Sequence, residues 1–570
     1  MSEAATTADD GARPAAGWAL PLALIAGITL WRLGLAALVP VTKDETYYFD
    51  WARHLAWGYF DHPPGVALLG LGTWLAPGSA LAARLGAVLA GALTLLLLWA
   101  FYRRCGLRRR GDLLLALVLA STTIAGLIAG IITTPDTALA LCWALALHEG
   151  AAALESDRRR WLTTGIATGL GLLGKYTMAV IGPVFLWALL RADPKALRSP
   201  WPYLGGLLAL LVFLPNILWN AHHDWLTLRF QFGHGFATET GAGAVPMAAD
   251  ALPAALPLAG SAEADPLVPR PPPGLAGRLV SVATYVGTQL AFWGLLLVPM
   301  TIALLRRGGL RRARRELAAT LTPAGRTLLT AGTVVPLVVF AAVAWISDVE
   351  ANWSGMYLAT AAGLAAVLLR PWPRRVLLAA ALNLLLIGVY ALHAATGVLP
   401  LPDAAERILR ETRGYEALAA HAAELPRPVF TDRYQTTALL NFYDPGLGVG
   451  QWPGITRPSE YLGGRITAIP SLNALRHSGF SLITRRYRPA PIPGFEVARM
   501  QTLFDCGGSQ IVVLDGDYGS DDAPCARPAH HWDVYVYRAT TDTAEPDGSA
   551  GAAPGTEPIM SRRRPRESSL

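Results

Sequence analysis

The chain has 570 residues, of which 53% are hydrophobic and only 16% charged, and it carries a formal net charge of +7. Soluble domains usually contain about 25% charged residues, so this composition excludes an ordinary soluble globule. The arginines and lysines gather in short runs between apolar stretches, as in the cytoplasmic loops of multi-pass membrane proteins. We attribute the basic charge to this topology, and the sequence predicts a polytopic α-helical membrane protein without a nucleic-acid partner.

Residues 1–16 lack the basic segment of a signal peptide and are expected to be disordered. The apolar run that follows, 17–40, is expected to remain as a transmembrane helix. With about 20 apolar residues for each span, further candidates are 79–101, 112–131, 135–154, 201–219, 279–304, 327–346, 353–369 and 376–396. Together with residues 161–190, these stretches define a predicted transmembrane domain over residues 17–401.

Residues 161–190 are ambiguous because a single helix of this length would exceed a hydrocarbon core of about 30 Å. Its middle reads "GLLGKYT", which would place Lys175 within the membrane, where an unpaired ammonium is costly. Two short helices that meet near Lys175 keep all the Arg/Lys-rich links on one side, and the positive-inside rule assigns that side to the cytoplasm. We therefore predict about eleven spans, with the carboxyl-terminal part outside.

Outside the spans, residues 236–277 are rich in Ala, Pro and Gly and are predicted to be a flexible insert. From 402 to 540, short β-type runs such as "RPVFTD" and "WDVYVYRA" alternate with helical ones, which indicates an extracytoplasmic α/β domain. The tail, 541–570, is expected to be disordered.

Cys506 and Cys525 fall in this outer domain, and in an oxidising compartment they are expected to form a structural disulfide. Cys105 and Cys142 belong to a cytoplasmic link and to a span. The histidines around residues 222–234 lack the ligand spacing of a zinc site, so no metal is indicated.

Unusual polar residues occur in every link on the predicted outer side. These links are residues 41–78, 133–136, 174–177, 220–235 and 347–357. We expect the polar chemistry of the protein to converge on this outer face.

The first of these links contains the pair Asp44 and Glu45. One interpretation is a helix start, since Thr42 and Asp44 are good N-cap residues and acids favour a helix N-terminus. The other is a general base at the membrane surface, where partial desolvation and a neighbouring carboxylate raise proton affinity. Spacing alone leaves both open.

Further polar residues have similar pairs of interpretations. His62 either caps the "DHPP" turn or meets an anionic lipid headgroup, and Asp136 is either a first-turn helix acid or a site residue. Lys175 either pairs with an outer-loop carboxylate or binds a phosphate. Arg84 lies near the outer start of its span, where snorkelling explains it, whereas Arg32 lies deeper and needs a counter-charge from protein or lipid.

Several motifs occur in a fixed order along the chain: "DETYYFDWARHLAWGYFDHPPG", "TTPD", "GLGLLGKYT", "PNILWNAHHDWLTLRFQ", "VEANW" and "RYQTTALLNFY". Their succession, over about residues 17–445, resembles the bacterial relatives of the dolichyl-phosphate-mannose protein mannosyltransferases. These belong, with the lipid A aminoarabinose transferases, to the GT-C class of polytopic glycosyltransferases.

The resemblance implies an inverting transfer of a sugar from a polyprenyl phosphate donor to an acceptor hydroxyl on the outer face. The donor is a substrate, so no cofactor is expected. In this family the first-loop acidic pair supplies the catalytic carboxylate, which maps onto Asp44 beside Glu45. Where the aminoarabinose transferases have Lys-Pro-Pro, this sequence has His62-Pro63-Pro64, which argues against a strict aminoarabinose transferase.

Together, the resemblance and the chemistry of phosphate departure assign roles to eleven residues. Predicted catalytic residues are Asp44, Glu45 and Asp136; predicted donor-phosphate ligands are Lys175, Arg84 and His62; predicted sugar or acceptor contacts are Tyr48, Asp61, Glu350, Asn352 and Trp353. For the last three, a polar loop with an interfacial Trp remains an open alternative.

Two other functions compete with the transferase. A lipid or polysaccharide transporter predicts charges through the span interiors and inverted repeats, whereas the unusual residues here gather on one face. An outer-domain binding module would act without the spans. The acceptor, whether protein, lipid or glycan, is not specified by the sequence.

Overall fold

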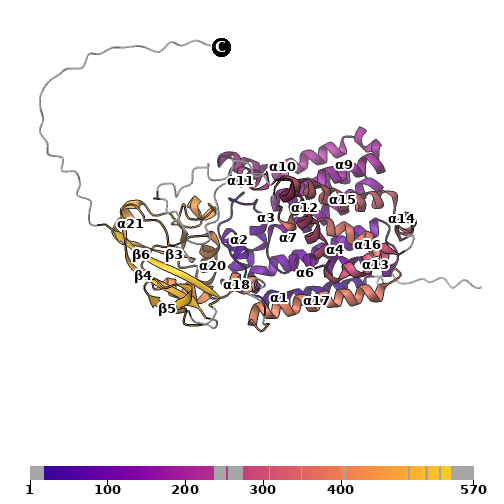
Figure 1. The fold of residues 1–570 in the computed structure, drawn as a ribbon. Helices are drawn as coiled ribbons and strands as arrows, with labels where there is room; N and C mark the ends of the chain where they lie inside the picture. Colours follow the sequence, from indigo (N-terminus) through magenta and orange to yellow (C-terminus); the bar gives the residue numbers. More distant parts are fainter. Residues whose placement is uncertain are drawn as a thin grey trace, which may run out of the picture.

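The computed structural model describes residues 18–236, 252–253, 274–306, 309–347, 349–399, 401, 406–485, 488–506, 511–525 and 528–540. It contains a helical bundle and, after it in the chain, a sheet domain that lies at one end of the bundle (Figure 1). The predicted class, a polytopic helical protein with a carboxyl-terminal α/β domain, is confirmed. The predicted disordered ends and most of the predicted insert lie outside the described residues.

Within the described ranges, six helices are long and apolar enough to span a membrane. They are α1 (Ala19–Leu38), α4 (Ala80–Arg104), α7 (Pro135–Glu155), α10 (Trp201–His222), α15 (Pro323–Ile346) and α17 (Pro373–Thr396). A seventh candidate is a pair bent by 92°, formed by α12 (Leu275–Ala291) and the segment Gly294–Leu305, which contains α13 (Leu297–Leu305). The count of eleven spans therefore stays a prediction.

Shorter helices occupy the remaining predicted spans. The stretch 112–131 is divided into α5 (Arg110–Thr122) and α6 (Ile124–Ala129), because Thr123 is extended and its side chain caps α6. The last of the shorter apolar helices, α16, covers Tyr357–Leu369. Helix α12 begins at Leu275, so it includes the last three residues of the range predicted as the insert.

The predicted break near Lys175 is confirmed. Helix α8 (Arg160–Gly174) ends at Lys175, which is extended, and the 3₁₀ turn η3 (Tyr176–Val180) then leads into α9 (Ile181–Ala192). Glycines of α8 also allow it to pack closely on α10, since a Cβ at Gly165 would lie 1.9 Å from the Gly205 carbonyl oxygen of α10. Close packing of small residues is a common basis of helix association in membranes.

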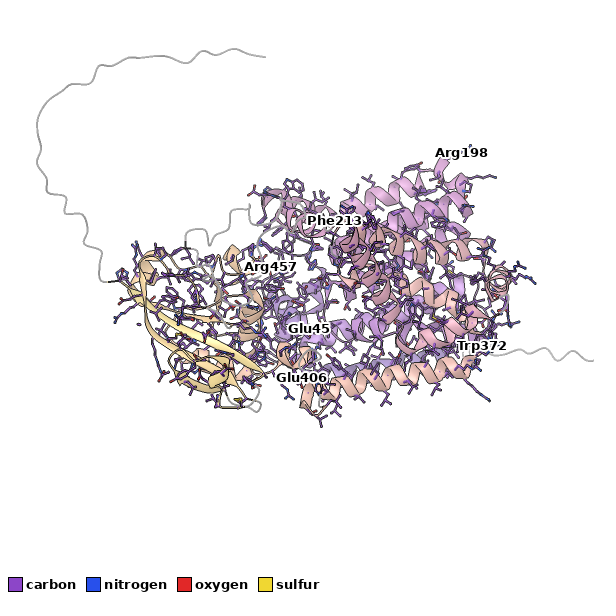
Figure 2. The ribbon with its side chains drawn as sticks, viewed as in Figure 1. Glu45, Arg198, Phe213, Trp372, Glu406 and Arg457 are labelled. Atoms are coloured by element: carbon purple, nitrogen blue, oxygen red, sulfur yellow. A yellow bond between two sulfur atoms is a disulfide. The ribbon has the colours of Figure 1, made fainter. Side chains whose placement is uncertain are left out.

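The two ends of the bundle differ in charge. Arg198, which ends the turn η4 (Pro194–Arg198), and Trp372 lie at the end away from the sheet domain (Figure 2). Both belong to predicted cytoplasmic links, and the arginine-rich α14 (Gly309–Thr320) lies at the same end (Figure 1). This common end agrees with the positive-inside assignment of those links.

Short elements connect the long helices in the predicted outer links. They are α2 (Lys43–Arg53), α3 (Gly65–Leu69), η2 (Leu71–Trp74), α11 (Leu226–Phe236) and η8 (Ala351–Ser354). Helix α2 begins with a capping box, in which the Thr42 side chain accepts from the Glu45 N–H and the Glu45 carboxylate accepts from the Thr42 N–H.

The sheet domain is built on a mixed sheet with strand order β2-β1-β3-β6-β4-β5. The strands are β1 (Val429–Thr431), β2 (Gly450–Gln451), β3 (Phe480–Thr484), β4 (Phe495–Asp505), β5 (Val512–Asp515) and β6 (His530–Ala539). β1 runs parallel to β2 and β3, and the other pairs are antiparallel. The helices are α18 (Arg407–Thr412), α19 (Tyr415–Ala423), α20 (Tyr434–Tyr443) and α21 (Leu472–Ser478), with short turns η9 (Glu460–Gly463) and η10 (Ser520–Asp522).

An aromatic interface joins the sheet domain to the bundle. Helix α2 packs against α20, and the buried rings of Tyr47, Trp51 and Tyr59 form one cluster with Tyr434 and Tyr461 of the sheet domain. Buried aromatic rings contribute large apolar areas to an interface. The outer link of the bundle and the sheet domain therefore form a continuous structure around α2.

Candidate active site

Glu45 is fully buried at the start of α2 and is saturated with hydrogen bonds. Arg84 of α4 donates to both of its oxygens, with Nε–Oε1 at 2.8 Å and Nη2–Oε2 at 2.5 Å. The backbone N–H groups of Thr133 and Thr42 donate to the same carboxylate at 3.0 Å each. No side of this carboxylate remains for a substrate in the described structure.

Arg84 is equally enclosed. Besides Glu45, its guanidinium donates to the carbonyl oxygens of Ala36, Val39 and Pro40 at 3.1, 2.6 and 3.0 Å. These carbonyls end α1, so the Arg84–Glu45 pair joins α1, α2 and α4. Bidentate, charge-assisted bonds fix geometry strongly. This arrangement favours a positioning role for both residues, in place of phosphate binding by Arg84 and of direct catalysis by Glu45.

Asp44 lies beside Glu45 in the chain but has the opposite environment. Its side chain is solvent-exposed, and the Tyr434 hydroxyl donates to its Oδ1 at 3.3 Å. Surrounding protein atoms restrict its hydration, and this desolvation raises the pKa of Asp44, with a smaller contribution from Glu411; Lys43, Arg457 and Tyr434 act in the opposite direction. The result is an accessible carboxylate with increased proton affinity, as a general base requires.

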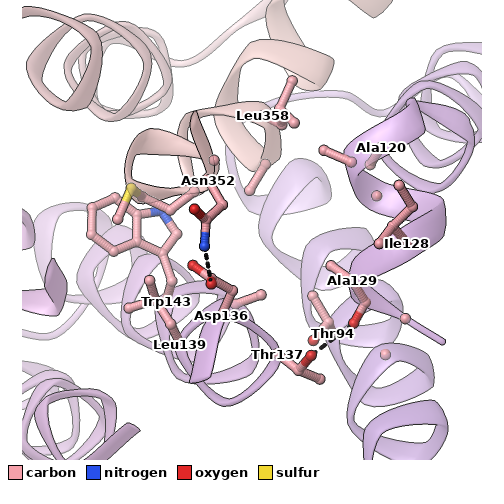
Figure 3. Close-up of a pocket in the computed structure, with 18 of the residues that line it drawn as sticks. Thr94, Ala120, Ile128, Ala129, Asp136, Thr137, Leu139, Trp143, Asn352 and Leu358 are labelled. Carbon is pink, nitrogen blue, oxygen red and sulfur yellow. Dashed lines mark hydrogen bonds between the residues drawn. The ribbon is translucent and has the colours of Figure 1, made fainter. Parts of the chain in front are cut away.

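A second group joins three predicted site residues from distant parts of the chain. The buried Lys175 ammonium lies 2.8 and 2.9 Å from the two oxygens of Asp136, which follows Pro135 at the start of α7. The Asn352 amide donates to Asp136 Oδ2 at 2.6 Å, as Figure 3 shows. Of the two interpretations of Lys175, the structure supports pairing with a carboxylate, that of Asp136.

Asp136 and Asn352 also line a cavity of about 350 Å³ between the helices (Figure 3). Its walls are mostly apolar, with Leu95, Leu139 and Leu358 among them. A few polar groups at one wall of an otherwise apolar cavity are typical of ligand sites.

The remaining outer-loop residues lie on the side of the sheet domain. Asp61 is buried and forms an ion pair with Arg457 at 2.9 Å, and Gln231 Nε2 lies 3.4 Å from His62 Nδ1. The rings of His62 and Tyr48 are 6.1 Å apart.

Tyr48 connects the two groups. Burial raises the pKa of its phenol well above the usual value, and the negative charges of Asp44, Asp61 and Asp136 raise it further. Charges that act on one phenol in this way lie in its neighbourhood. The predicted acids of the first loop and of "TTPD" thus share the neighbourhood of Tyr48.

Arg457 and Tyr434 are contributions of the sheet domain that the sequence prediction did not include as site residues. The Arg457 guanidinium lies 4.2 Å from the ring centre of Tyr434 and 5.2 Å from that of Phe230. Burial alone would lower its pKa, but Asp61 and Tyr434 raise it well above the usual value. Tyr434 is part of a motif noted in the sequence, whereas no local pattern distinguishes Arg457 from other arginines.

The "VEANW" residues differ in their placement. Asn352 reaches Asp136, as described above, whereas Glu350 is exposed and Trp353 lies 6.1 Å from the Phe340 ring of α15. Within the described residues, no three His, Cys, Asp or Glu side chains form a group that could hold a metal ion. Cys506 and Cys525 form the predicted disulfide, and Cys105 and Cys142 are free thiols.

Residues 61–219 match the family described as dolichyl-phosphate-mannose-protein mannosyltransferase. An undecaprenyl phosphate-α-4-amino-4-deoxy-L-arabinose arabinosyl transferase of Sodalis glossinidius is 29% identical over 202 residues, which are 34% of this chain and 36% of the relative. The lipid A galacturonosyltransferase RgtD of Rhizobium johnstonii is 27% identical over 218 residues, 36% of this chain and 45% of the relative. The alignments thus span less than half of either relative.

Structural similarity extends much further along the chain. The crystal structure of ArnT from Cupriavidus metallidurans in the apo state has a TM-score of 0.55 at 14% identity, and covers 92% of this chain and 98% of that one. Its undecaprenyl phosphate-bound form has a TM-score of 0.53. These findings confirm the resemblance drawn from the motifs: the chain is similar to the lipid A aminoarabinose transferases and shares the overall fold of ArnT.

Proposed function

We propose that the protein is an inverting glycosyltransferase that moves a sugar from a polyprenyl phosphate donor to an acceptor hydroxyl on the outer face of the inner membrane. The observation that carries the proposal is the position of Asp44, an exposed carboxylate with raised proton affinity. Asp44 shares the neighbourhood of Tyr48 with Asp136. Asp136 also lines the mostly apolar cavity among the helices. A water-borne acceptor and a lipid-borne donor can meet at such a boundary.

In the proposed reaction, Asp44 takes the proton of the acceptor hydroxyl while the acceptor oxygen attacks the anomeric carbon. The bond between that carbon and the phosphate oxygen breaks, and the lipid phosphate leaves with the electron pair. A phosphate leaving group is already anionic, so no general acid is needed, and single displacement inverts the configuration. Cations are needed opposite the base to stabilise the departing charge.

For the donor phosphate we propose Lys175, with His62 as a weaker partner because imidazole is largely neutral near pH 7. Lys175 would exchange part of its contact with Asp136 for the phosphate, and Asp136 and Asn352 would then orient the sugar. Glu45 and Arg84 are proposed as positioning residues, since all their polar groups are bonded within the protein. Asp61 would act through Arg457.

The acceptor is proposed to be a lipid or a glycan on the outer leaflet, because both curated relatives transfer sugars in the context of lipid A or undecaprenyl phosphate according to their names. A protein acceptor remains the alternative. The sheet domain, residues 402–540, would help to select it, since Tyr434 and Arg457 reach the neighbourhood of Asp44. The catalytic spans would be residues 17–401.

The test is transfer by the purified full chain in nanodiscs. Polyprenyl phosphates carrying labelled aminoarabinose, galacturonic acid or mannose are offered with lipid A, peptide and glycan acceptors, and products are identified by mass spectrometry and NMR. We expect one donor to give a product of inverted anomeric configuration together with free polyprenyl phosphate. Retention of configuration, or hydrolysis without any transfer, would contradict the proposal.

A further inference from the structure

Arg32 lies on α1, six positions before the helix ends at Leu38. At 1.5 Å per residue this places it about 9 Å below the outer end of the helix. Its side chain is only 3% exposed, so it does not snorkel toward water. A guanidinium at this depth is costly unless protein or ligand compensates its charge.

The protein holds the guanidinium in a fitted place. Its Nη2 donates to the carbonyl oxygen of Gly126 in α6 at 2.7 Å. Two glycines leave room for the group: a Cβ at Gly130 would lie 2.2 Å from Arg32 Cζ, and a Cβ at Gly91 would lie 2.8 Å from Nη1. Any larger residue at Gly130 would displace the side chain.

Only part of the hydrogen-bonding capacity of Arg32 is used. Among the residues that the structure describes, neither Nε nor Nη1 has a hydrogen-bond partner, although both atoms are buried. No carboxylate of the described residues forms an ion pair with this guanidinium. A buried, unpaired cation with free donors is a strong candidate for binding an anion.

Arg32 lines the same cavity as Asp136 and Asn352. Figure 3 shows Ile128 and Ala129 of α6, the wall to which Arg32 is bonded, across the cavity from Asn352. The polar Lys175–Asp136–Asn352 group and Arg32 thus lie on different walls. Apart from Thr94, Thr134 and Thr137, the rest of the lining is apolar, which suits a hydrocarbon chain better than a freely soluble anion.

We propose that Arg32 binds the phosphate of a lipid that enters this cavity, as a second anion site distinct from Lys175. The proposal rests on the proposed function only in the choice of lipid phosphate as the anion. That phosphate belongs either to the polyprenyl carrier or to the acceptor lipid, and both present the same oxygens to a guanidinium.

Binding is measured with the full chain in nanodiscs of zwitterionic phospholipid, whose headgroups carry no net charge, in a buffer without inorganic phosphate. The probes are undecaprenyl phosphate, undecaprenol as its uncharged equivalent, phosphatidic acid as a phosphate on acyl chains, and inorganic phosphate. We expect Arg32→Gln to weaken the binding of undecaprenyl phosphate by about 10- to 100-fold, because charge-assisted bonds to the phosphate are lost. The affinity for undecaprenol should not change. Arg32→Lys should retain part of the affinity.

Gly130→Ala keeps the charge but displaces the guanidinium, so it should reproduce the selective loss. Thr29→Val, one turn away on α1 with its hydroxyl bonded to Ile25 within the helix, is the matched control. A loss confined to phosphatidic acid would identify the acceptor as the source of the phosphate. The proposal would be overturned if Arg32→Gln lost affinity equally for undecaprenol and undecaprenyl phosphate. Unchanged binding of both lipid phosphates by Arg32→Gln would overturn it as well.

The outcome is separable from that of the proposed function because binding needs no sugar transfer. If the wild-type chain transfers sugar and Arg32→Gln binds both lipid phosphates normally, this inference fails while the function stands. If Arg32 is needed for lipid phosphate binding but no sugar is transferred, the function fails and the inference stands.

Discussion

Replacing Glu45 by Gln tests whether this residue positions the site or reacts. The carboxylate is fully buried and accepts from two nitrogens of Arg84 and from two backbone N–H groups. Gln offers one acceptor oxygen, and its amide NH₂ would face one of these donors. The Arg84 guanidinium would keep its bonds to three carbonyls but lose its counter-charge.

Removing one partner of a buried ion pair costs about 3–5 kcal/mol. Since a folded domain is stable by only about 5–15 kcal/mol, we expect Glu45→Gln to lower the stability of the detergent-solubilised protein strongly. Unfolding is followed by tryptophan fluorescence during denaturant titration. A double-mutant cycle with Arg84→Met isolates the pairwise coupling, and two residues in direct contact should couple clearly.

Asp44→Asn serves as the matched control, because Asp44 is exposed and should change stability little. If Glu45→Gln is as stable as wild type while its turnover falls as far as that of Asp44→Asn, the positioning role is refuted. The base would then be Glu45.

Four residues give the remaining predictions. Lys175→Ala should raise the donor KM by about 10-fold or more, as for a lost charge-assisted contact, with a smaller effect on the acceptor KM; an unchanged donor KM would make Lys175 only a structural partner of Asp136. Burial raises the pKa of Glu460 to about 7, so the folded state holds this proton more tightly than the unfolded state. The free energy of unfolding should therefore fall as pH rises from about 4.5 to 7. Glu460→Gln should flatten this part of the stability profile, and an unchanged profile would refute the assignment. Replacing Cys506 and Cys525 by Ser opens a loop with a sequence separation of 19 and should cost about 3 kcal/mol in denaturant unfolding; equal stability with and without reductant would contradict this.

The membrane part of the fold was largely predictable because long apolar runs and arginine-rich links are local signals. The break at Lys175 was predictable for the same reason, since a lysine among glycines in an overlong apolar run conflicts with a continuous span. The exact number of spans was not, because α5, α8 and α16 are short and only their packing shows that they belong to the bundle. Strand β4 has a weak local signal, because most of its first half is exposed.

The candidate site was predictable as a set of residues but not as a set of roles. Asp44 and Glu45 are neighbours in sequence, yet successive residues on a helix face different directions, and only the tertiary structure places Arg84 against one of them. The pairing of Lys175 with Asp136 was one of two open interpretations and needed the fold to decide it. Arg457 comes from a region without a local motif, so its contact with Asp61 could not be inferred.

The most direct test of the central claim is the single-turnover rate of sugar transfer by Asp44→Asn, measured beside donor binding in the same nanodiscs. Asn keeps the size of the side chain and can still accept from Tyr434, but it cannot take the acceptor proton. We predict a fall in rate of about 10² to 10⁴ with unchanged donor affinity, and a wild-type rate that declines as pH falls through the raised pKa of Asp44. Near-normal transfer by Asp44→Asn would contradict the assignment of Asp44 as the base and remove the basis of the proposed mechanism.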